Sequence, residues 1–292
     1  MRKVIAAGEL AKEKGLAIVT GTQRRHQARY LQNAHAIAQG AIGKIKAGRV
    51  WWCGGLRRTL RRQPGQSDAE YMTRNGNWYC FSQMSGDHIV EQHVHNLDVA
   101  NWFIGRPPVQ ALGFGGRARR VGGNQYDFFS VDLDYGDDVV VHSMCRQVNG
   151  CYTQISEQFI GTEGTAWGDG KRTGKQVTVP EFAEKANNPY VQEHCDLIKS
   201  IREGKPLNEA RNLADATMVA IMGRLSAYTG QIVRWVDLTR NENSPLYNLT
   251  LTPAALDFEK GTVVCPQENV IPIPGAAEGE AATTKKGKKA KK

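Results

Sequence analysis

Five strand-like segments separated by turn signals limit the folds open to this chain more than any other feature. β-Branched, aromatic and other apolar residues are concentrated in these segments, which span 46–53, 109–114, 128–135, 139–145 and 153–160. Glycine-containing turns such as Gly136-Asp137-Asp138 separate consecutive segments. Two helical patterns follow, over about 191–203 and about 212–229, and each ends at a glycine. The spacing predicts a large sheet, with helices that close the domain against one of its faces.

The N-terminal residues have a different pattern. Residues 2–14 have the spacing of an amphipathic helix that ends at Gly15, and residues 16–20 predict a short buried strand. Parallel strands need neighbours and crossover helices. A single helix–strand unit therefore predicts the end of a doubly wound domain whose beginning lies outside this chain. A further helix is expected over about 30–39.

The positive charge of the chain is concentrated at its C-terminus. The 292 residues carry a net charge of +9, but six lysines lie in the last eight residues, which leaves +3 for residues 1–284. A Pro-, Gly-, Ala- and Glu-rich segment precedes the lysines, and residues 266–292 are predicted to be a disordered Lys-rich tail. A lysine run can hold phosphate backbones or anionic surfaces, whereas a solvated tail needs no partner. The mildly basic remainder does not predict a nucleic-acid partner.

The compartment is inferred from cysteines and apolar runs. Six cysteines are scattered without a C-x-x-C pair, which favours reduced, packed thiols. No run approaches the length of a membrane span, and the N-terminus has no signal-peptide core. The chain as given is expected in the cytoplasm, and an upstream segment with an export signal would reverse that expectation.

The segment from Gly86 to Gly105 carries the strongest candidate chemistry. On a continuous helix, Glu91, His95, Asp98 and Trp102 share one narrow stripe. A carboxylate one turn from an imidazole can orient the ring and raise its basicity, which is typical of a proton-transfer pair. The alternative is that both carboxylates are solvated and His95 is a hydrogen-bonded core histidine.

A metal site is a third interpretation of the same segment. His93-x-His95 with Glu91 and Asp98 supplies nitrogen and oxygen ligands. On a helix, however, the two histidines lie about 200° apart, so one ion cannot easily take both. No metal ligand is therefore predicted.

Motifs of several common enzyme classes do not occur in the sequence. There is no G-x-x-x-x-G-K-[ST], G-x-S-x-G or H-E-x-x-H. The segment Gly113-Phe-Gly115-Gly116 lacks the G-x-G-x-x-G spacing and is expected to be a strand-to-loop bend. P-loop, α/β-hydrolase and zincin chemistry are thus excluded, and no cofactor-binding residue is predicted.

Four segments together resemble the glucose-fructose oxidoreductase, inositol dehydrogenase and rhizopine-catabolism (Gfo/Idh/MocA) family, in particular its bacterial-type members with a long C-terminal domain. They are GTQRRHQARY (21–30), RNGNWYCFSQMSGDHIVEQHVHNLDVANWFIG (74–105), YDFFSVDLDYGDDVVVHSMCRQ (126–147) and YVQEHCDLIKSIREGKPLNEARNLADATMVAIMGRLSAYTGQIVRW (190–235). The resemblance implies an oxidoreductase that uses NAD or NADP and acts on a sugar, a cyclitol or a derivative.

The resemblance also implies the domain organisation. The fold is expected to be α+β, with a large, mostly antiparallel open sheet that has helices on one face and is preceded by a terminal αβ remnant of a Rossmann domain. Residues 1–22 would be that remnant, and residues 23–265 the C-terminal substrate and oligomerisation domain. The glycine-rich loop and the Glu-Lys-Pro motif of the family would lie upstream of Met1.

Site residues follow from the same resemblance. The family's catalytic D-x-x-x-H pair corresponds to Glu91 and His95, with glutamate where many relatives have aspartate. His95 would accept the hydroxyl proton, and Glu91 would hold the ring. The expected substrate-binding residues are Asp98, Asn96, Trp102, Arg24, Arg25 and Tyr30. Alternatively, Arg24 and Arg25 are an exposed pair at a strand end, and Tyr30 packs in the core. Asn96 and Asp98 could instead cap local backbone.

Two functions from different classes remain open. In the first, the chain is the substrate-binding and catalytic-base portion of an NAD(P)-dependent oxidoreductase and is inactive alone, because nothing in it holds a nicotinamide within hydride reach. In the second, it is a non-catalytic sugar-binding or assembly subunit. Cofactor-independent hydrolysis or epimerisation by Glu91 and His95 is a third interpretation. The family resemblance also implies a homo-oligomer that pairs through the sheet.

Overall fold

A seven-stranded sheet forms the centre of the computed structural model, which describes residues 1–182, 188–249, 253–275 and 281–282. The strand order is β6-β5-β1-β4-β3-β2-β7. Only the pair β1–β4 is parallel, and the other pairs of this sheet are antiparallel. The strands are β1 (Ile45–Gly54), β2 (Gln110–Gly116), β3 (Phe128–Asp134), β4 (Val140–Gln147), β5 (Gln154–Gly161), β6 (Thr165–Trp167) and β7 (Val233–Arg234). The five predicted strand segments are confirmed, as is the mostly antiparallel sheet.

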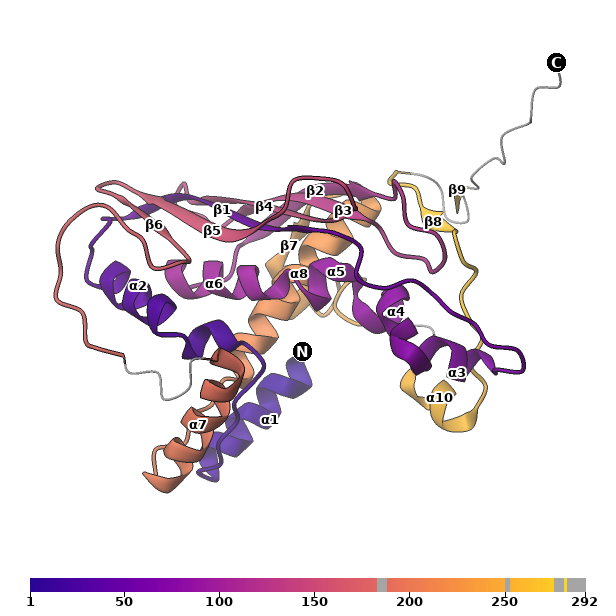
Figure 1. Ribbon diagram of the computed structural model, residues 1–292, viewed down its shortest axis with the longest axis horizontal. Helices are drawn as coiled ribbons and strands as arrows, with labels where there is room; N and C mark the ends of the chain where they lie inside the picture. The colour runs from indigo at the N-terminus through magenta and orange to yellow at the C-terminus, as the bar shows by residue number, and fades with distance from the viewer. Residues whose placement is uncertain (183–187, 250–252, 276–280, 283–292) are drawn as a thin grey trace, which may run out of the picture.

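Helices cover one face of this sheet (Figure 1). They are α2 (Ala28–Ala38), α5 (Asp87–Glu91), α6 (Val94–Ile104) and α8 (Ala210–Thr229). Alternate residues of β3, namely Phe129, Val131 and Leu133, are buried because they point toward the helices. No described helix lies over the opposite face (Figure 1). The predicted α+β class, with helices on one face, is therefore confirmed.

The N-terminal helix α1 (Arg2–Glu13) packs against α8. A Cβ atom on Gly8 would lie 2.6 Å from Cβ of Ala210, so a glycine allows this close approach. The segment 16–20, predicted to be a buried strand, forms only an isolated parallel bridge from Ile18 to Asn208. The prediction of a strand over 16–20 is therefore wrong, because a strand needs a continuous ladder of hydrogen bonds to a neighbour and this segment makes one bridge.

Helix α7 (Pro189–Arg202) is anchored near the same end of the molecule through the short helix η1 (Gln23–His26). Nδ1 of His26 lies 2.7 Å from Asp196 of α7, and Nε2 lies 3.0 Å from Glu209, the residue before α8. The predicted helices at about 30–39, 191–203 and 212–229 correspond to α2, α7 and α8.

A second, smaller core lies beside the sheet. It is formed by Tyr71, Met72, Phe81 and Val263. The helices of this part are α3 (Asp68–Thr73), η2 (Arg74–Cys80), α4 (Ser82–Ser85) and α10 (Ala255–Lys260), and the remaining elements are α9 (Trp235–Thr239), β8 (Ile271–Pro272) and β9 (Ala281–Ala282).

Part of the predicted disordered tail has a defined structure. The Tyr126 hydroxyl donates to the carbonyl of Pro272 at 2.8 Å, and Asn269 N donates to the carbonyl of Gly123 at 2.8 Å. Disorder is thus wrong for residues 266–275, because these contacts repay the ordering of the chain. The rest of the prediction falls largely on 276–280 and 283–292, which lie outside the described residues. Among the described helices, none has the length and hydropathy needed to cross a membrane.

Candidate functional site

The predicted continuous helix over 86–105 is broken in two. Helix α5 ends at Glu91, and α6 begins at Val94. His93 at the break is fully buried, and its Nε2 lies 2.8 Å from Oγ of Ser143 on β4. Its backbone N–H donates to the carbonyl of His88, five residues back, at 3.0 Å. This tertiary contact outweighs helix continuity, so the prediction of one stripe that joins Glu91 to the residues of α6 is wrong.

His95 lies on α6 with its ring against an aromatic side chain of the sheet. The imidazole stacks on the indole of Trp52 of β1, with ring centroids 5.7 Å apart and an interplanar angle of 28°. Its Nδ1 is buried without a hydrogen-bond partner. Burial and the nearby Arg24 charge lower the pKa of His95 to about 4. The ring is therefore neutral at neutral pH and can accept a proton.

Glu91 is separated from His95 by the break between the helices. Its Oε1 accepts a hydrogen bond from Nε2 of Gln92 at 2.9 Å, and Tyr79 lies beside the carboxylate. Burial raises the pKa of Glu91. Within the described chain, no hydrogen bond or ion pair joins Glu91 to His95. The geometry thus does not include the predicted contact through which Glu91 would hold the imidazole.

Three of the predicted substrate-binding residues surround a buried carboxylate. Glu157 of β5 is 0% exposed, and it forms an ion pair with Arg24. It also accepts a hydrogen bond from Nδ2 of Asn96 at 2.6 Å and one from the hydroxyl of Tyr30 at 3.1 Å. Arg24, Asn96 and Tyr30 are therefore engaged inside the protein, and the exposed-pair alternative does not describe Arg24. A lone glutamate in the apolar strand pattern of 153–160 is the sequence signal that could have identified Glu157.

The other predicted substrate-binding residues form a second saturated contact. Nε and Nη2 of Arg25 each donate to one carboxylate oxygen of Asp98 at 2.8 Å. The same guanidinium lies over the ring of Trp102, 4.9 Å from its centroid. Asp98 is almost completely buried. Such a bidentate ion pair, here called the structural lock, fixes η1 against α6.

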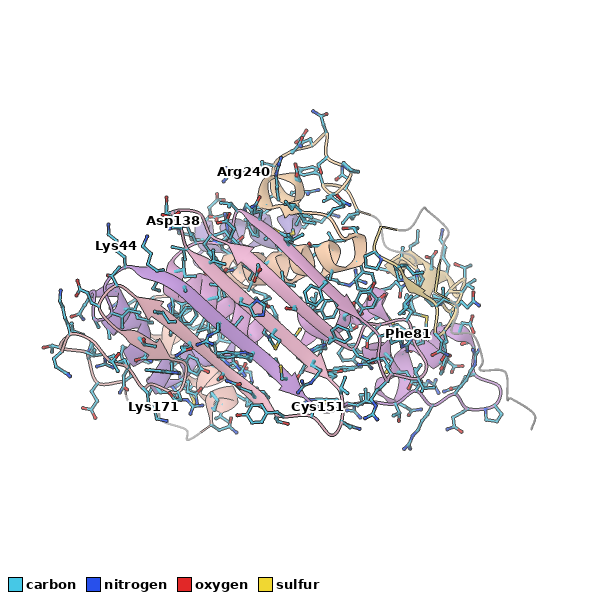
Figure 2. The ribbon with its side chains drawn as sticks, turned by 90° about the horizontal axis from the view of Figure 1, so that it is seen from above. Lys44, Phe81, Asp138, Cys151, Lys171 and Arg240 are labelled. Carbon is cyan, nitrogen blue, oxygen red and sulfur yellow. The ribbon has the colours of Figure 1, made fainter. Side chains whose placement is uncertain are left out.

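A pocket beside Trp52, on which His95 stacks, lies at the end of β1. It has a volume of about 410 Å³ and is lined by Trp52, Gly54, Gly55, Leu56, Arg57, Gln147, Thr153 and Ile155. Figure 2 shows the sheet from its open face, with Cys151 in the turn after β4 near this end and Lys44 at the opposite end of β1. Trp52 is the residue of this lining that stacks on the predicted residue His95.

A chain of hydrogen-bonded side chains begins at Gln147, which lines this pocket. Nη2 of Arg120 donates to Oε1 of Gln147 at 2.7 Å, and Nε2 of Gln147 donates to the hydroxyl of Tyr79 at 2.5 Å. Arg120 is itself paired with the buried Asp127. An arginine side chain only donates hydrogen bonds, so the amide oxygen of Gln147 must face Arg120 and its NH2 group must face Tyr79. The Tyr79 oxygen accepts that hydrogen bond, which leaves its own hydrogen to point toward Glu91. Gln147 and Tyr79 carry no signal in the sequence, since they lie far apart in the chain. Arg57 belongs to a basic cluster with Arg58, Arg61 and Arg62, for which the sequence favours exposed loop charge over contact with an anionic ligand.

The described residues do not form a dinucleotide site of the βαβ type. The sheet has one parallel pair, and Gly113 and Gly115 lie inside β2, where a Cβ atom would approach backbone of β3 within 3 Å. These glycines allow β2 and β3 to pair closely, and they do not form a phosphate-binding loop at the N-terminus of a helix.

Comparisons with known proteins agree with this architecture. Residues 30–167 match the family model described as GFO/IDH/MocA C-terminal domain. A search of curated proteins found no match.

Among solved structures, a probable dehydrogenase from Thermotoga maritima has a TM-score of 0.58 and 16% identity, over 79% of this chain and 68% of that one. GenD2 from gentamicin A biosynthesis, in complex with NAD, has a TM-score of 0.60 and 15% identity, over 79% and 67%. Myo-inositol 2-dehydrogenase from Lactobacillus plantarum has a TM-score of 0.56 and 18% identity, over 80% and 70%. At these identities the likeness concerns the fold, and it agrees with the match of residues 30–167 to the C-terminal domain of the Gfo/Idh/MocA family.

Proposed function

We propose that this chain supplies the substrate pocket and the proton-accepting group of an NAD(P)-dependent oxidoreductase that acts on a sugar, a cyclitol or a derivative. The observation that carries the proposal is the neutral, partly exposed imidazole of His95 stacked on Trp52, which itself lines the pocket of about 410 Å³. An aromatic platform with a few convergent polar groups is typical of a small-molecule site.

In this proposal, His95 takes the proton of a substrate hydroxyl. Its Nδ1 is enclosed, which leaves Nε2 as the nitrogen that meets the substrate. A pKa of about 4 keeps the ring ready to accept a proton at neutral pH, although it makes the ring a weak base. The carboxylate of Glu91, held by Gln92 and Tyr79, stabilises the resulting imidazolium through its charge and not through a hydrogen bond.

Trp52 and the polar residues of the pocket bind the substrate. The indole of Trp52 packs against the C–H face of a sugar ring, and Thr153 and Gln147 offer hydrogen bonds to its hydroxyl groups. Asp98, Trp102 and Arg25 act at a distance, because their mutual contacts position α6 and therefore His95.

NAD or NADP is the redox partner in this proposal, supported by the family match and by the NAD complex of GenD2. The nicotinamide cofactor supplies hydride exchange when bound. In this proposal the βαβ site that holds the cofactor is not formed by the described residues. The purified 292-residue chain is therefore expected to show little or no turnover with NAD+ or NADP+ and a polyol.

Sugar binding by the isolated chain tests the pocket without requiring turnover. Saturation-transfer NMR with glucose and myo-inositol should show binding to the 292-residue chain, and Trp52→Ala should remove it. Trp78→Ala, which changes a partly exposed tryptophan of the smaller helical part, is the matched control. Binding that survives Trp52→Ala would place the sugar site elsewhere, and NAD+ reduction by the isolated chain would contradict the expected inactivity.

We also propose that the open face of the sheet pairs with a second copy of this chain. Strand register places Phe114, Met144 and Trp51 on that face, and Phe114 is 65% exposed. A row of exposed apolar side chains on a sheet face favours an interface. Sedimentation should show a dimer or a larger assembly that dissociates in Phe114→Asp. A monomeric wild-type chain would contradict this part of the proposal.

A further inference from the structure

We propose that the pocket beside Trp52 selects an anionic sugar derivative, whose carboxylate or phosphate group binds the guanidinium of Arg57. This inference rests on the proposed function and narrows its substrate class. The chemistry shared by the two anions is a planar or trigonal set of oxygens that a guanidinium recognises through paired N–H donors.

The segment that carries Arg57 is fastened at its start. Leu56 N donates to Oδ1 of Asn149 at 2.8 Å, and Val148 N donates to the carbonyl of Gly54 at 3.0 Å. A Cβ atom on Gly55 would lie 2.7 Å from Oδ1 of Asn149, so the absence of a side chain at Gly55 leaves room for this hydrogen bond. Arg57 therefore leaves the sheet from a defined position at the mouth of the pocket.

The same segment is fastened again a few residues later. Arg61 N donates to Oδ1 of Asn77 at 3.3 Å, and Nδ2 of Asn77 donates to the carbonyl of Arg61 at 2.9 Å. Between the two attachments lie Arg57 and Arg58, two neighbouring arginines that are both exposed. The structure thus holds the backbone on both sides of Arg57.

The two neighbouring arginines have different surroundings. Nε of Arg58 lies 3.4 Å from where a Cβ atom of Gly76 would stand, so its side chain lies against η2. Arg57 instead lines the pocket and acts electrostatically on Glu91 and Tyr79. Its side chain is therefore directed toward the site, and that of Arg58 is not.

Arg57 also differs from the buried arginines Arg24 and Arg120 in having no partner among the described residues. Arg24 and Arg120 are paired with Glu157 and Asp127, whereas Arg57 makes no hydrogen bond or ion pair with any residue in the described ranges. Glu91 is the acidic group that Arg57 influences, but its Oε1 is engaged by Gln92. A guanidinium beside an aromatic platform and an amide is left for an anion of the ligand.

Calorimetric titration of the 292-residue chain with four sugars tests the inference. The probes are glucuronate and glucose 6-phosphate, which distinguish carboxylate from phosphate, and glucose and myo-inositol, which carry no charge. At least one anionic sugar should bind more tightly than both neutral sugars. Arg57→Gln should weaken that binding about 10- to 100-fold, as expected for a lost charge-assisted hydrogen bond, and should leave neutral sugars unchanged. Arg58→Gln is the matched control and should change neither.

The outcomes separate this inference from the function on which it rests. If neutral sugars bind at least as tightly as the anionic ones, or if Arg57→Gln behaves like Arg58→Gln, the anionic substrate class is wrong while the sugar pocket stands. If none of the four sugars binds, the pocket assignment fails and the inference fails with it. Added salt should weaken binding of the anionic sugar more than that of glucose, and equal weakening would also contradict the role of Arg57.

Discussion

Two groups of polar side chains pack beneath the sheet, and they differ in whether their carboxylates have cationic partners. Around Glu157 and Asp98, the carboxylates meet cationic partners. Along the break between α5 and α6, Glu91 and His95 each keep a buried atom without a partner. A buried polar atom without a partner costs free energy. The satisfied group holds the fold together, whereas the unsatisfied group lies next to Trp52, which lines the pocket.

The largest effect should come from breaking the satisfied group. Arg25→Ala leaves Asp98 buried without its bidentate partner, which should lower the free energy of unfolding by about 3–5 kcal/mol. Chemical denaturation measures this loss. Arg211→Ala removes the exposed pair with Asp215 and should cost less than about 1 kcal/mol. Equal costs for the two variants would mean that the Arg25–Asp98 pair is not a structural lock.

A smaller effect is expected from Asn96→Ala. Nδ2 of Asn96 donates to the carbonyl of Trp51 at 3.0 Å and to Glu157 at 2.6 Å, so the variant strips one donor from a buried carboxylate. The free energy of unfolding should fall by about 1–3 kcal/mol. If denaturation instead shows no loss, Glu157 must be satisfied without Asn96, and the division between the two groups would weaken.

The smallest effect should come from the unsatisfied group, and it should depend on pH. His95→Asn removes no described hydrogen bond, so at pH 7 the free energy of unfolding should change by less than about 1 kcal/mol. In the folded chain the pKa of His95 is lowered to about 4 from an ordinary value of 6.5. The unfolded state therefore binds more protons between these values, and the contribution of His95 is present above pH 6.5 and is lost as the pH falls toward 4.

The variant lacks this loss, so its stability relative to the wild type should rise by about 2 kcal/mol between pH 7 and pH 5. Paired urea titrations at the two values provide the comparison. The proton resonances of the His95 ring should also show no titration above about pH 5. A ring that titrates near 6.5 would mean that the imidazole is not desolvated, and its place in the proposed site would need revision.

Periodicity along the chain predicted most of the sheet because it depends on local alternation. The segment 128–135 alternates apolar and polar residues, and β3 occupies Phe128–Asp134. The glycines after residues 203 and 229 likewise predicted the helix ends, since Gly204 and Gly230 have positive φ values of 64° and 71°. The same local logic failed at residues 16–20, where a strand needs a neighbour that the described chain does not provide.

The sequence by itself determined the strands, the long helices and the presence of a histidine- and carboxylate-rich segment, because these follow from residue order. Only the tertiary structure decided which of those polar residues face one another. His93 bonds to Ser143 and interrupts the helix, which separates Glu91 from His95. Arg24, Tyr30 and Asn96 meet Glu157, whose sequence position lies more than 60 residues from each of them. Such pairings depend on how the chain returns to the same place, and spacing along a single segment does not contain that information.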